Sequence, residues 1–423
     1  TQGVSSAASD VYKRQLLGLA SVAAAQESVP RLIADTLASH PGLRAQHERV
    51  QAAAAGVASA RWRYWPTPSV STEHAYSGND PQYRGDRQTT TLRLQQTLWS
   101  GGRLTANLSR AQLREAIQRL DDDALRLALA LRVVQAWSDA VSAQSSVRAH
   151  ELNHRTHLRL FAMVERRVQA GASAPSDLDL AQSRLHSASA ELETARLRQE
   201  TARNNLTLLA GRPSELQSLH GVPPPPAIDE PQSALGQALE RNPQIGKAEA
   251  QWRLAGAEIA TVQASAMPEV YLRVERQSGS YGYPNARPQS RVFLGLSTAF
   301  GAGLSNLSDI EAARAEQRAA EQELQSQRLS LEEQVRTDLF LLDASTRRRA
   351  LLEQARRVNE EVSSSWERQF LADRKQWQDL MNSARDQAMT DTQLADAIGS
   401  QQLSAWRLAI LTRGLPTVAT DLP

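Results

Sequence analysis

The sequence predicts a mostly α-helical chain with a small β part, in which a unit of helix, strand, strand, long helix and helix occurs twice. Three observations indicate this: a repeat at an offset of 202 residues within 423, long stretches of heptad spacing, and four short segments of alternating polarity. Matching positions at that offset are His40-Pro41 with Asn242-Pro243, Pro66 with Pro268, and Asp177-Leu178 with Asp379-Leu380.

The repeat sets the expected domain boundaries. We expect a first structural repeat at 26–210, a Pro-rich linker at 211–232, a second structural repeat at 233–415 and a tail at 416–423. Pro223–Pro226 forms the stiff centre of the linker.

Residues 1–25 predict a truncated signal peptide. Lys13-Arg14 precede the apolar stretch Leu16–Val22, and Ala23-Ala24-Ala25 offers a cleavage site of small residues. A short apolar helix is the alternative. Thr1–Tyr12 starts without Met and is too polar for a signal, so we expect an artefactual start here.

The composition is typical of long helices, with few aromatic residues and a balanced formal charge of +2. No face forms a basic stripe with interleaved aromatics, so no nucleic-acid partner is expected. The sequence contains no Cys, which excludes disulfides and Cys-ligated metals. No run of about 18 apolar residues follows the N-terminus, so no transmembrane helix is predicted.

In the first copy, residues 31–64 predict a helix that ends at Trp65-Pro66, because the residue before proline avoids the helical conformation. Residues 70–76 and 91–98 alternate in polarity, which predicts two strands joined by a polar loop at 77–88.

Ser100-Gly101-Gly102 ends the second strand, and an apolar heptad seam begins after Arg103. No breaker follows until the turn around Gly171, so a helix of about 100 Å is expected at 1.5 Å per residue. Ser176-Asp177 predicts the start of the next helix, which ends near Ala210.

The second copy repeats this plan. Its expected elements are a helix at 232–266, strands at 270–275 and 292–300, a loop at 277–289, a long helix at 305–371 and a last helix at 376–412. Sharp joints between strands and helices are predicted at Gly101, Gly102, Gly301, Gly303, Pro66 and Pro268.

Four strands of about 8–10 residues, each with one apolar and one polar face, match the pattern of outer-membrane β-strands. Four strands cannot close a barrel, and an open sheet edge in lipid is not viable. We therefore expect several chains to share one barrel, and three chains would supply twelve strands.

At this point the sequence resembles the TolC family of outer-membrane export channels, from about residue 30 to residue 415. The segments that carry the resemblance are the His40-Pro41 and Asn242-Pro243 turns, Pro66 and Pro268, the joints Leu98–Arg103 and Ala299–Gly301, and the helix tips Val168–Leu178 and Asp373–Leu380.

The resemblance implies a homotrimer with a twelve-stranded β-barrel in the outer membrane of a Gram-negative bacterium. A long α-helical barrel would continue it into the periplasm. The loops at 77–88 and 277–289 would face outward. The implied partners are two further copies of the chain, outer-membrane lipid, a periplasmic adaptor (membrane fusion) protein and an inner-membrane pump.

The resemblance also implies a closed periplasmic gate in the second copy, at positions matching Lys375, Asp379 and Asn382, with Asp177 equivalent to Asp379. One inward carboxylate per chain would form a ring of three charges that attracts cations. The alternative is that Asp177 and Asp379 only favour the helix dipole in the first turn.

The tips implied to contact an adaptor are Gly171, Ala172 and Ser173 in the first copy, and Asp373 and Arg374 in the second. Asp373 stands where the family usually has Gly, so the second tip departs from the family pattern. Because copy two combines Asp373 with Lys375 and Asp379, we expect it to carry the gate.

Two motifs outside the gate have competing interpretations. His150-Glu151-Leu152-Asn153-His154 has the H-E-x-x-H spacing of a zinc protease, and His157 extends the same helical face. The motif lies in an Arg-rich helix without a convincing third ligand. We favour a solvated or pore-facing helix surface over a protease site or adventitious metal binding. Trp62, Tyr64 and Trp65 predict an aromatic belt at the membrane interface, with core packing as the alternative.

Together these observations predict the outer-membrane channel of a tripartite exporter, a passive conduit without cofactor or enzymatic activity. Because no Cys follows the predicted signal, we favour type I protein secretion or a related exporter. The alternatives are a periplasmic coiled-coil adaptor or structural protein and, remotely, a zinc metalloprotease.

Overall fold

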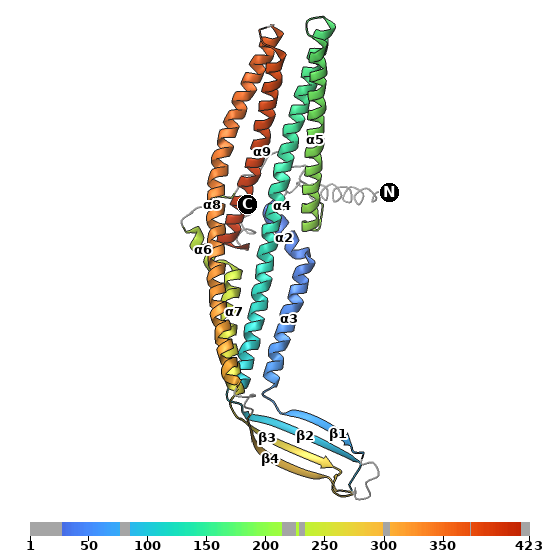
Figure 1. Cartoon of the computed structure of the whole chain (residues 1–423), viewed down its shortest axis with the longest axis vertical. Helices are drawn as coiled ribbons and strands as arrows, with labels where there is room; N and C mark the ends of the chain where they lie inside the picture. Colours follow the sequence, from blue (N-terminus) through green and yellow to red (C-terminus); the bar gives the residue numbers. More distant parts are fainter. Residues whose placement is uncertain are drawn as a thin grey trace, which may run out of the picture. The chain divides into compact units, whose positions relative to one another are not determined.

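The computed structural model describes residues 28–76, 85–213, 226–227, 233–298, 305–372 and 374–415 (Figure 1). The predicted signal peptide, most of the linker, the tail and residues 77–84 lie outside the described residues. Gly301, Gly303 and Asp373 lie outside them as well.

The predicted order of elements is confirmed in both copies. The first contains α2 (Val29–Ser39), α3 (Pro41–Trp62), β1 (Thr67–His74), β2 (Gln88–Trp99), α4 (Arg103–Gln169) and α5 (Pro175–Ala210). The second contains α6 (Ala234–Arg241), α7 (Pro243–Ser265), β3 (Glu269–Ser278), β4 (Gln289–Ser297), α8 (Asn306–Leu371) and α9 (Trp377–Arg413).

Each repeat starts with two helices where the sequence predicted one. His40 takes the extended conformation (φ −67°, ψ 123°), because the residue before proline avoids the helical region. Asn242 does the same (φ −73°, ψ 119°), and its side chain accepts a hydrogen bond of 2.8 Å from the backbone N–H of Gln244. The predictions of unbroken helices at 31–64 and 232–266 were therefore wrong.

The start of α5 also differs from the prediction by one residue. The helix begins at Pro175, and Ala174 is the N-cap without a side-chain hydrogen bond. Proline suits the first helical position because its missing N–H would have no intrahelical partner there. Ser176 therefore lies inside the first turn.

The four strands form one antiparallel sheet in the order β1-β2-β3-β4 (Figure 1). Because directly opposed residues share a face, the register separates polar from apolar side chains. Leu94 lies opposite Val274, which lies opposite Val292 on the next strand. On the other face Arg93 lies opposite Glu275, and the two form an ion pair of 2.6 Å.

The apolar face of this sheet is open to solvent in the single chain. Val292, Leu294 and Leu296 of β4 are 68%, 72% and 69% exposed. Among the described residues, β1 and β4 also have only one strand neighbour each, so both outer edges carry unpaired backbone groups. This sheet is therefore incomplete by itself.

The chain folds into two compact units, and each unit contains parts of both repeats. The described part of the first unit falls within Thr1–His40, Leu127–Leu235 and Val335–Pro423. The second comprises Pro41–Arg126 and Gly236–Gln334, which includes the sheet. The repeats divide the sequence, whereas the units divide the fold in space.

The core of the first unit forms where α2, α4, α5 and α9 meet. Trp137 of α4 is fully buried and belongs to one apolar cluster with Leu32, Leu206 and Ile410. Burial of such a side chain contributes about 1.5–3 kcal/mol each. This cluster fixes the short helix α2 against the long helices.

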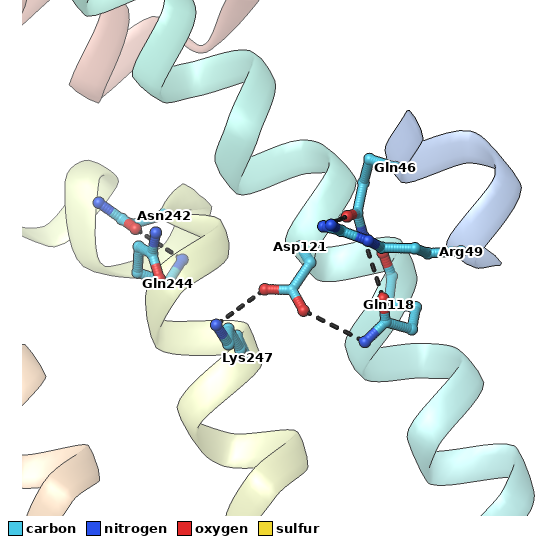
Figure 2. Close-up of polar contacts among 7 residues, drawn as sticks. All are labelled: Gln46, Arg49, Gln118, Asp121, Asn242, Gln244 and Lys247. Atoms are coloured by element: carbon cyan, nitrogen blue, oxygen red, sulfur yellow. Dashed lines mark hydrogen bonds and ion pairs between the residues drawn. The ribbon is translucent and has the colours of Figure 1, made fainter. Parts of the chain in front are cut away.

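In the second unit, polar side chains connect α3, α4 and α7 (Figure 2). The Nζ of Lys247 lies 2.8 Å from a carboxylate oxygen of Asp121. Gln46 donates from its Nε2 to the backbone oxygen of Gln118 at 3.0 Å. Because Gln46 is buried, this bond also satisfies a group that could not otherwise reach water.

The joint between β2 and α4 depends on left-handed glycines. Gly101 has φ +57° and Gly102 has φ +90°. A Cβ at Gly101 would also collide with the side chain of Met267. The joint in this copy therefore requires glycine at position 101 for both conformation and space.

Gly101→Ala should lower the free energy of unfolding by at least about 1–2 kcal/mol, because an L-residue is strained in the left-handed region. Gly56→Ala is the matched control: it lies within α3 with nothing near the added Cβ, and should stabilise by about 0.5–1 kcal/mol. Thermal unfolding followed by circular dichroism measures both. Equal midpoints for the two variants would contradict this account of the joint.

Candidate functional site at the helix turns and the adjoining cavity

The turn between α4 and α5 is a Schellman motif. Gly171 has φ +70°, and its N–H donates to the oxygen of Val168 at 3.0 Å. The N–H of Ala172 donates to the oxygen of Arg167 at 2.7 Å. These two bonds satisfy carbonyl groups at the end of the helix. Gly171 and Ala172 are exposed, whereas Ser173 is half-buried.

The turn between α8 and α9 has two matching backbone bonds 202 residues later. The backbone N–H of Arg374 donates to the oxygen of Gln369 at 2.9 Å, as that of Ala172 does to the oxygen of Arg167. The backbone N–H of Asp379 donates to the oxygen of Gln376 at 3.1 Å, as that of Asp177 does to the oxygen of Ala174 at 3.0 Å. The two tips are therefore equivalent in these backbone bonds.

The side chains at the second tip differ from those at the first. The Nζ of Lys375 lies 3.3 Å from Oδ2 of Asp379 and 4.2 Å from the ring centroid of Trp366. Both members of the ion pair are partly exposed, so the pair contributes less than about 1 kcal/mol. The first copy has Ser173 and Val164 at the positions of Lys375 and Trp366, and cannot form this arrangement.

Beneath the turns, an apolar cluster joins both helical hairpins. Its buried members are Leu160, Met163 and Val164 of α4, Ala181 of α5, Phe370 of α8, and Trp377, Leu380, Met381 and Ala384 of α9. The α9 members follow helical spacing, so they occupy one face of that helix. Asp379 falls between them in sequence and therefore lies off this face, where it is partly exposed.

Asn382 lines a cavity of about 440 Å³ bounded by α4, α5 and α9, and neither Asp379 nor Lys375 lines that cavity. The predicted gate residues are thus divided between an ion pair at the turn and a cavity wall.

His150 of the H-E-x-x-H segment and His157, three residues beyond that segment, also line this cavity. His157 is only 6% exposed, and burial lowers the pKa of its imidazole below the usual 6.5. The expectation of a solvated or pore-facing surface was wrong at His157, because α5 and α9 pack over it. Glu151 points elsewhere, toward Arg196 at 3.8 Å.

The described residues contain no group of three His, Asp or Glu side chains arranged to hold a metal ion. Likewise, none of the helices in the described ranges combines the length and apolar character needed to cross a membrane.

Sequence reasoning found the histidines but missed the cavity itself. The cavity is also lined by Arg184 of α5 and Arg385 of α9, which are distant in sequence from the histidines and from each other. No motif connects these positions, so only the packing of the helices could reveal them.

At the opposite end of the helices, the joints also carry aromatic residues. Trp62 and Trp65 are 70% and 65% exposed, with ring centroids 6.3 Å apart. Core packing therefore does not describe them in this chain. Pro66 lies between α3 and β1, and Pro268 lies between α7 and β3.

The outer membrane efflux protein family matches the chain over residues 32–212 and 234–412, which covers both repeats. The chain belongs to this family. Membership places it in the outer membrane, and the family is one of transport channels rather than enzymes.

Two curated relatives are similar to parts of the chain. The pyoverdine export outer membrane protein OpmQ of Pseudomonas putida is 29% identical over 38% of this chain. Protein CyaE of Bordetella pertussis is 28% identical over 64% of this chain. The chain spans only 35% and 57% of the length of these two relatives.

The fold also matches solved outer-membrane channels. The Campylobacter jejuni CmeC channel superposes with a TM-score of 0.79 at 15% identity, covering 93% of this chain and 87% of CmeC. At this identity the likeness establishes a common fold.

The buried imidazole predicts a pH dependence. Because the folded-state pKa of His157 lies below 6.5, the unfolded chain binds more protons below that value, and the free energy of unfolding falls as pH falls through it. His157→Gln should therefore lose less stability than the parent between about pH 7.5 and about pH 5. Circular dichroism melts measure the difference.

The control is His186→Gln, which changes an exposed histidine of α5. It should keep the parent's pH dependence. If His157→Gln lost as much stability as the parent on acidification, this assignment would be overturned.

Proposed function

We propose that this chain is the outer-membrane channel subunit of a tripartite export system. In this role it is a passive conduit that receives substrate from a periplasmic adaptor and an inner-membrane pump. The observation that carries the proposal is the incomplete sheet with an exposed apolar face. Along the chain, strand β2 is followed by α4, which has 67 residues, and strand β4 is followed by α8, which has 66 residues.

The sheet supports assembly into a homotrimer with a twelve-stranded barrel. In lipid, the unpaired edges of β1 and β4 would leave backbone groups without partners, which costs several kcal/mol for each group. Pairing β1 of one copy with β4 of the next removes both edges. The apolar face then meets lipid, and the face with Arg93 and Glu275 lines the channel.

Exposed apolar side chains on the helices support the same assembly. Leu197 and Leu208 of α5 are 69% and 80% exposed, and Phe340 and Leu351 of α8 are 74% and 67% exposed. Neighbouring copies would cover them in an α-helical barrel extending into the periplasm. Trp62 and Trp65 would then form the aromatic belt at the periplasmic rim of the bilayer.

The name of one relative refers to pyoverdine export, which supports export as the role of the proposed channel, by type I secretion or by efflux. We assign the chain no catalytic role and no cofactor. The exposed tip residues Gly171, Ala172 and Arg374 are proposed adaptor contacts, together with Ser173; Asp373 lies outside the described residues.

The purified mature chain should form a heat-resistant trimer that conducts ions in planar bilayers. Cell fractionation should recover it in the outer membrane. A monomeric, soluble periplasmic protein without conductance would overturn the proposal and favour an adaptor or structural role. Zinc-dependent peptidase activity would instead revive the protease interpretation of residues 150–154.

Asp379 is the proposed charge of the periplasmic gate. Asp379→Ala should lower the permeability of K⁺ relative to Cl⁻ by at least about fivefold, since each of the three carboxylates it removes contributes about 1 kcal/mol to an ion at about 4 Å in water. Reversal potentials across a KCl gradient measure the ratio.

Asp177→Ala is the matched control, because Asp177 occupies the equivalent backbone position in the first copy. It should leave the ratio near that of the parent. Equal effects of the two substitutions would show that neither carboxylate is special and would favour a common helix-dipole role.

A further inference from the structure

The cavity between α4, α5 and α9 has the chemistry of a ligand site. Its floor contains buried polar groups from α4. Asn153 is 8% exposed and His157 is 6% exposed, and both line the cavity. Buried polar groups in folded proteins are nearly always hydrogen-bonded, so those without partners need an explanation.

Several polar atoms around this floor have no hydrogen-bond partner among the described residues. They are Oδ1 of Asn153, Nδ1 of His157, Nδ1 of His150 and Nε1 of Trp377. The Nδ2 of Asn153 donates weakly to Glu191 at 3.5 Å. The buried groups thus offer an acceptor at Asn153 of the floor and a donor at Trp377 of α9.

The mouth of the cavity is positively charged. Arg184 and Arg385 line it and are exposed, and no ion pair involving either is found in the described part of the chain. Glu191 is the single carboxylate among the residues that line the cavity. It belongs to α5, like Arg184, and lies 3.7 Å from Nδ1 of His150 of α4. The lining therefore carries two guanidinium groups and one carboxylate, which favours an anion at the mouth.

The walls between mouth and floor are largely apolar. Trp377 and Met381 of α9 are each 7% exposed, and Ala188 of α5 is 2% exposed. Leu180 also lines the space. A flat apolar body would contact these side chains, and a volume of about 440 Å³ holds a single aromatic ring with its substituents.

We propose that this cavity binds a small aromatic carboxylate that carries a hydroxyl group at the opposite end of its ring. The carboxylate pairs with Arg184 and Arg385. The ring packs against Trp377 and Met381, and the hydroxyl donates to Asn153 while accepting from Trp377. Such a ligand would join α9 to α4 and α5.

Other ligand classes fit these walls less well. The cavity offers no suitable ligands for a metal ion, because the described residues hold no cluster of three His, Asp or Glu side chains. An organic cation would face Arg184 and Arg385. A purely apolar molecule would leave the polar floor unsatisfied, which is unfavourable in a buried site.

The test is calorimetric titration of the detergent-solubilised full chain with 4-hydroxybenzoate. The neutral analogue 4-hydroxybenzamide and the cation 4-hydroxybenzylamine are titrated in parallel. The carboxylate should bind most tightly and the cation least. The absence of binding by the carboxylate, or equal binding by all three compounds, would overturn the proposal.

Variants locate the binding. Arg184→Gln and Arg385→Gln should each weaken binding about tenfold, because each removes a charge-assisted hydrogen bond. Arg198→Gln is the matched control, since Arg198 is exposed on α5 and does not line the cavity. It should bind like the parent.

Ser187→Leu provides a steric test that does not depend on charge. Ser187 lines the cavity from an exposed position, so leucine can enter the space without disturbing the buried core. Binding should be lost while the circular dichroism melt is retained. Unchanged affinity in Ser187→Leu and both cavity arginine variants would place binding elsewhere and refute the site. Binding is measured without conductance, so this result is independent of the proposed channel.

Discussion

The unsatisfied edges of the four-stranded sheet are the constraint on which the rest of this structure depends. Backbone N–H and C=O groups along the outer sides of β1 and β4 need partners, and lipid offers none. The apolar face formed by Leu94, Val274 and Val292 makes water an equally poor environment. In the proposed channel, strands of further copies pair with both edges, and lipid covers the apolar face. A long helical chain with so small a sheet is consistent with a subunit built for assembly.

The duplication lets one backbone plan serve two purposes. The described residues of both tips share two terminal hydrogen bonds, and both entry helices break at an X-Pro step. Within this shared backbone the side chains diverge. Lys375 contacts both Trp366 and Asp379 at the second tip, where the first has Ser173 and Val164. A symmetric scaffold therefore carries an asymmetric distribution of charge, which is what a gate formed by one hairpin requires.

The ends of the helices differ in how they are fixed. At the joint with the sheet, Gly101 and Met267 leave no room for a Cβ, so geometry alone determines the residue. At the tips, the anchors are the buried apolar residues Trp377 and Leu380, with Asp379 off their face. Next to them the packing leaves a polar cavity instead of a filled core. Packing at this end is thus less complete than at Trp137, where α2, α4, α5 and α9 close on one cluster.

The sequence by itself determined the order of elements, the duplication and the strand faces, because heptad spacing, period-two alternation and prolines act locally. The predicted entry helices ran unbroken through His40-Pro41 and Asn242-Pro243, although both were named as turns and the proline rule ends a helix there. Only the tertiary structure decided that His157 is buried and that Arg184 and Arg385 share a cavity with it. Those residues belong to three helices, and no local pattern records which faces of distant helices meet.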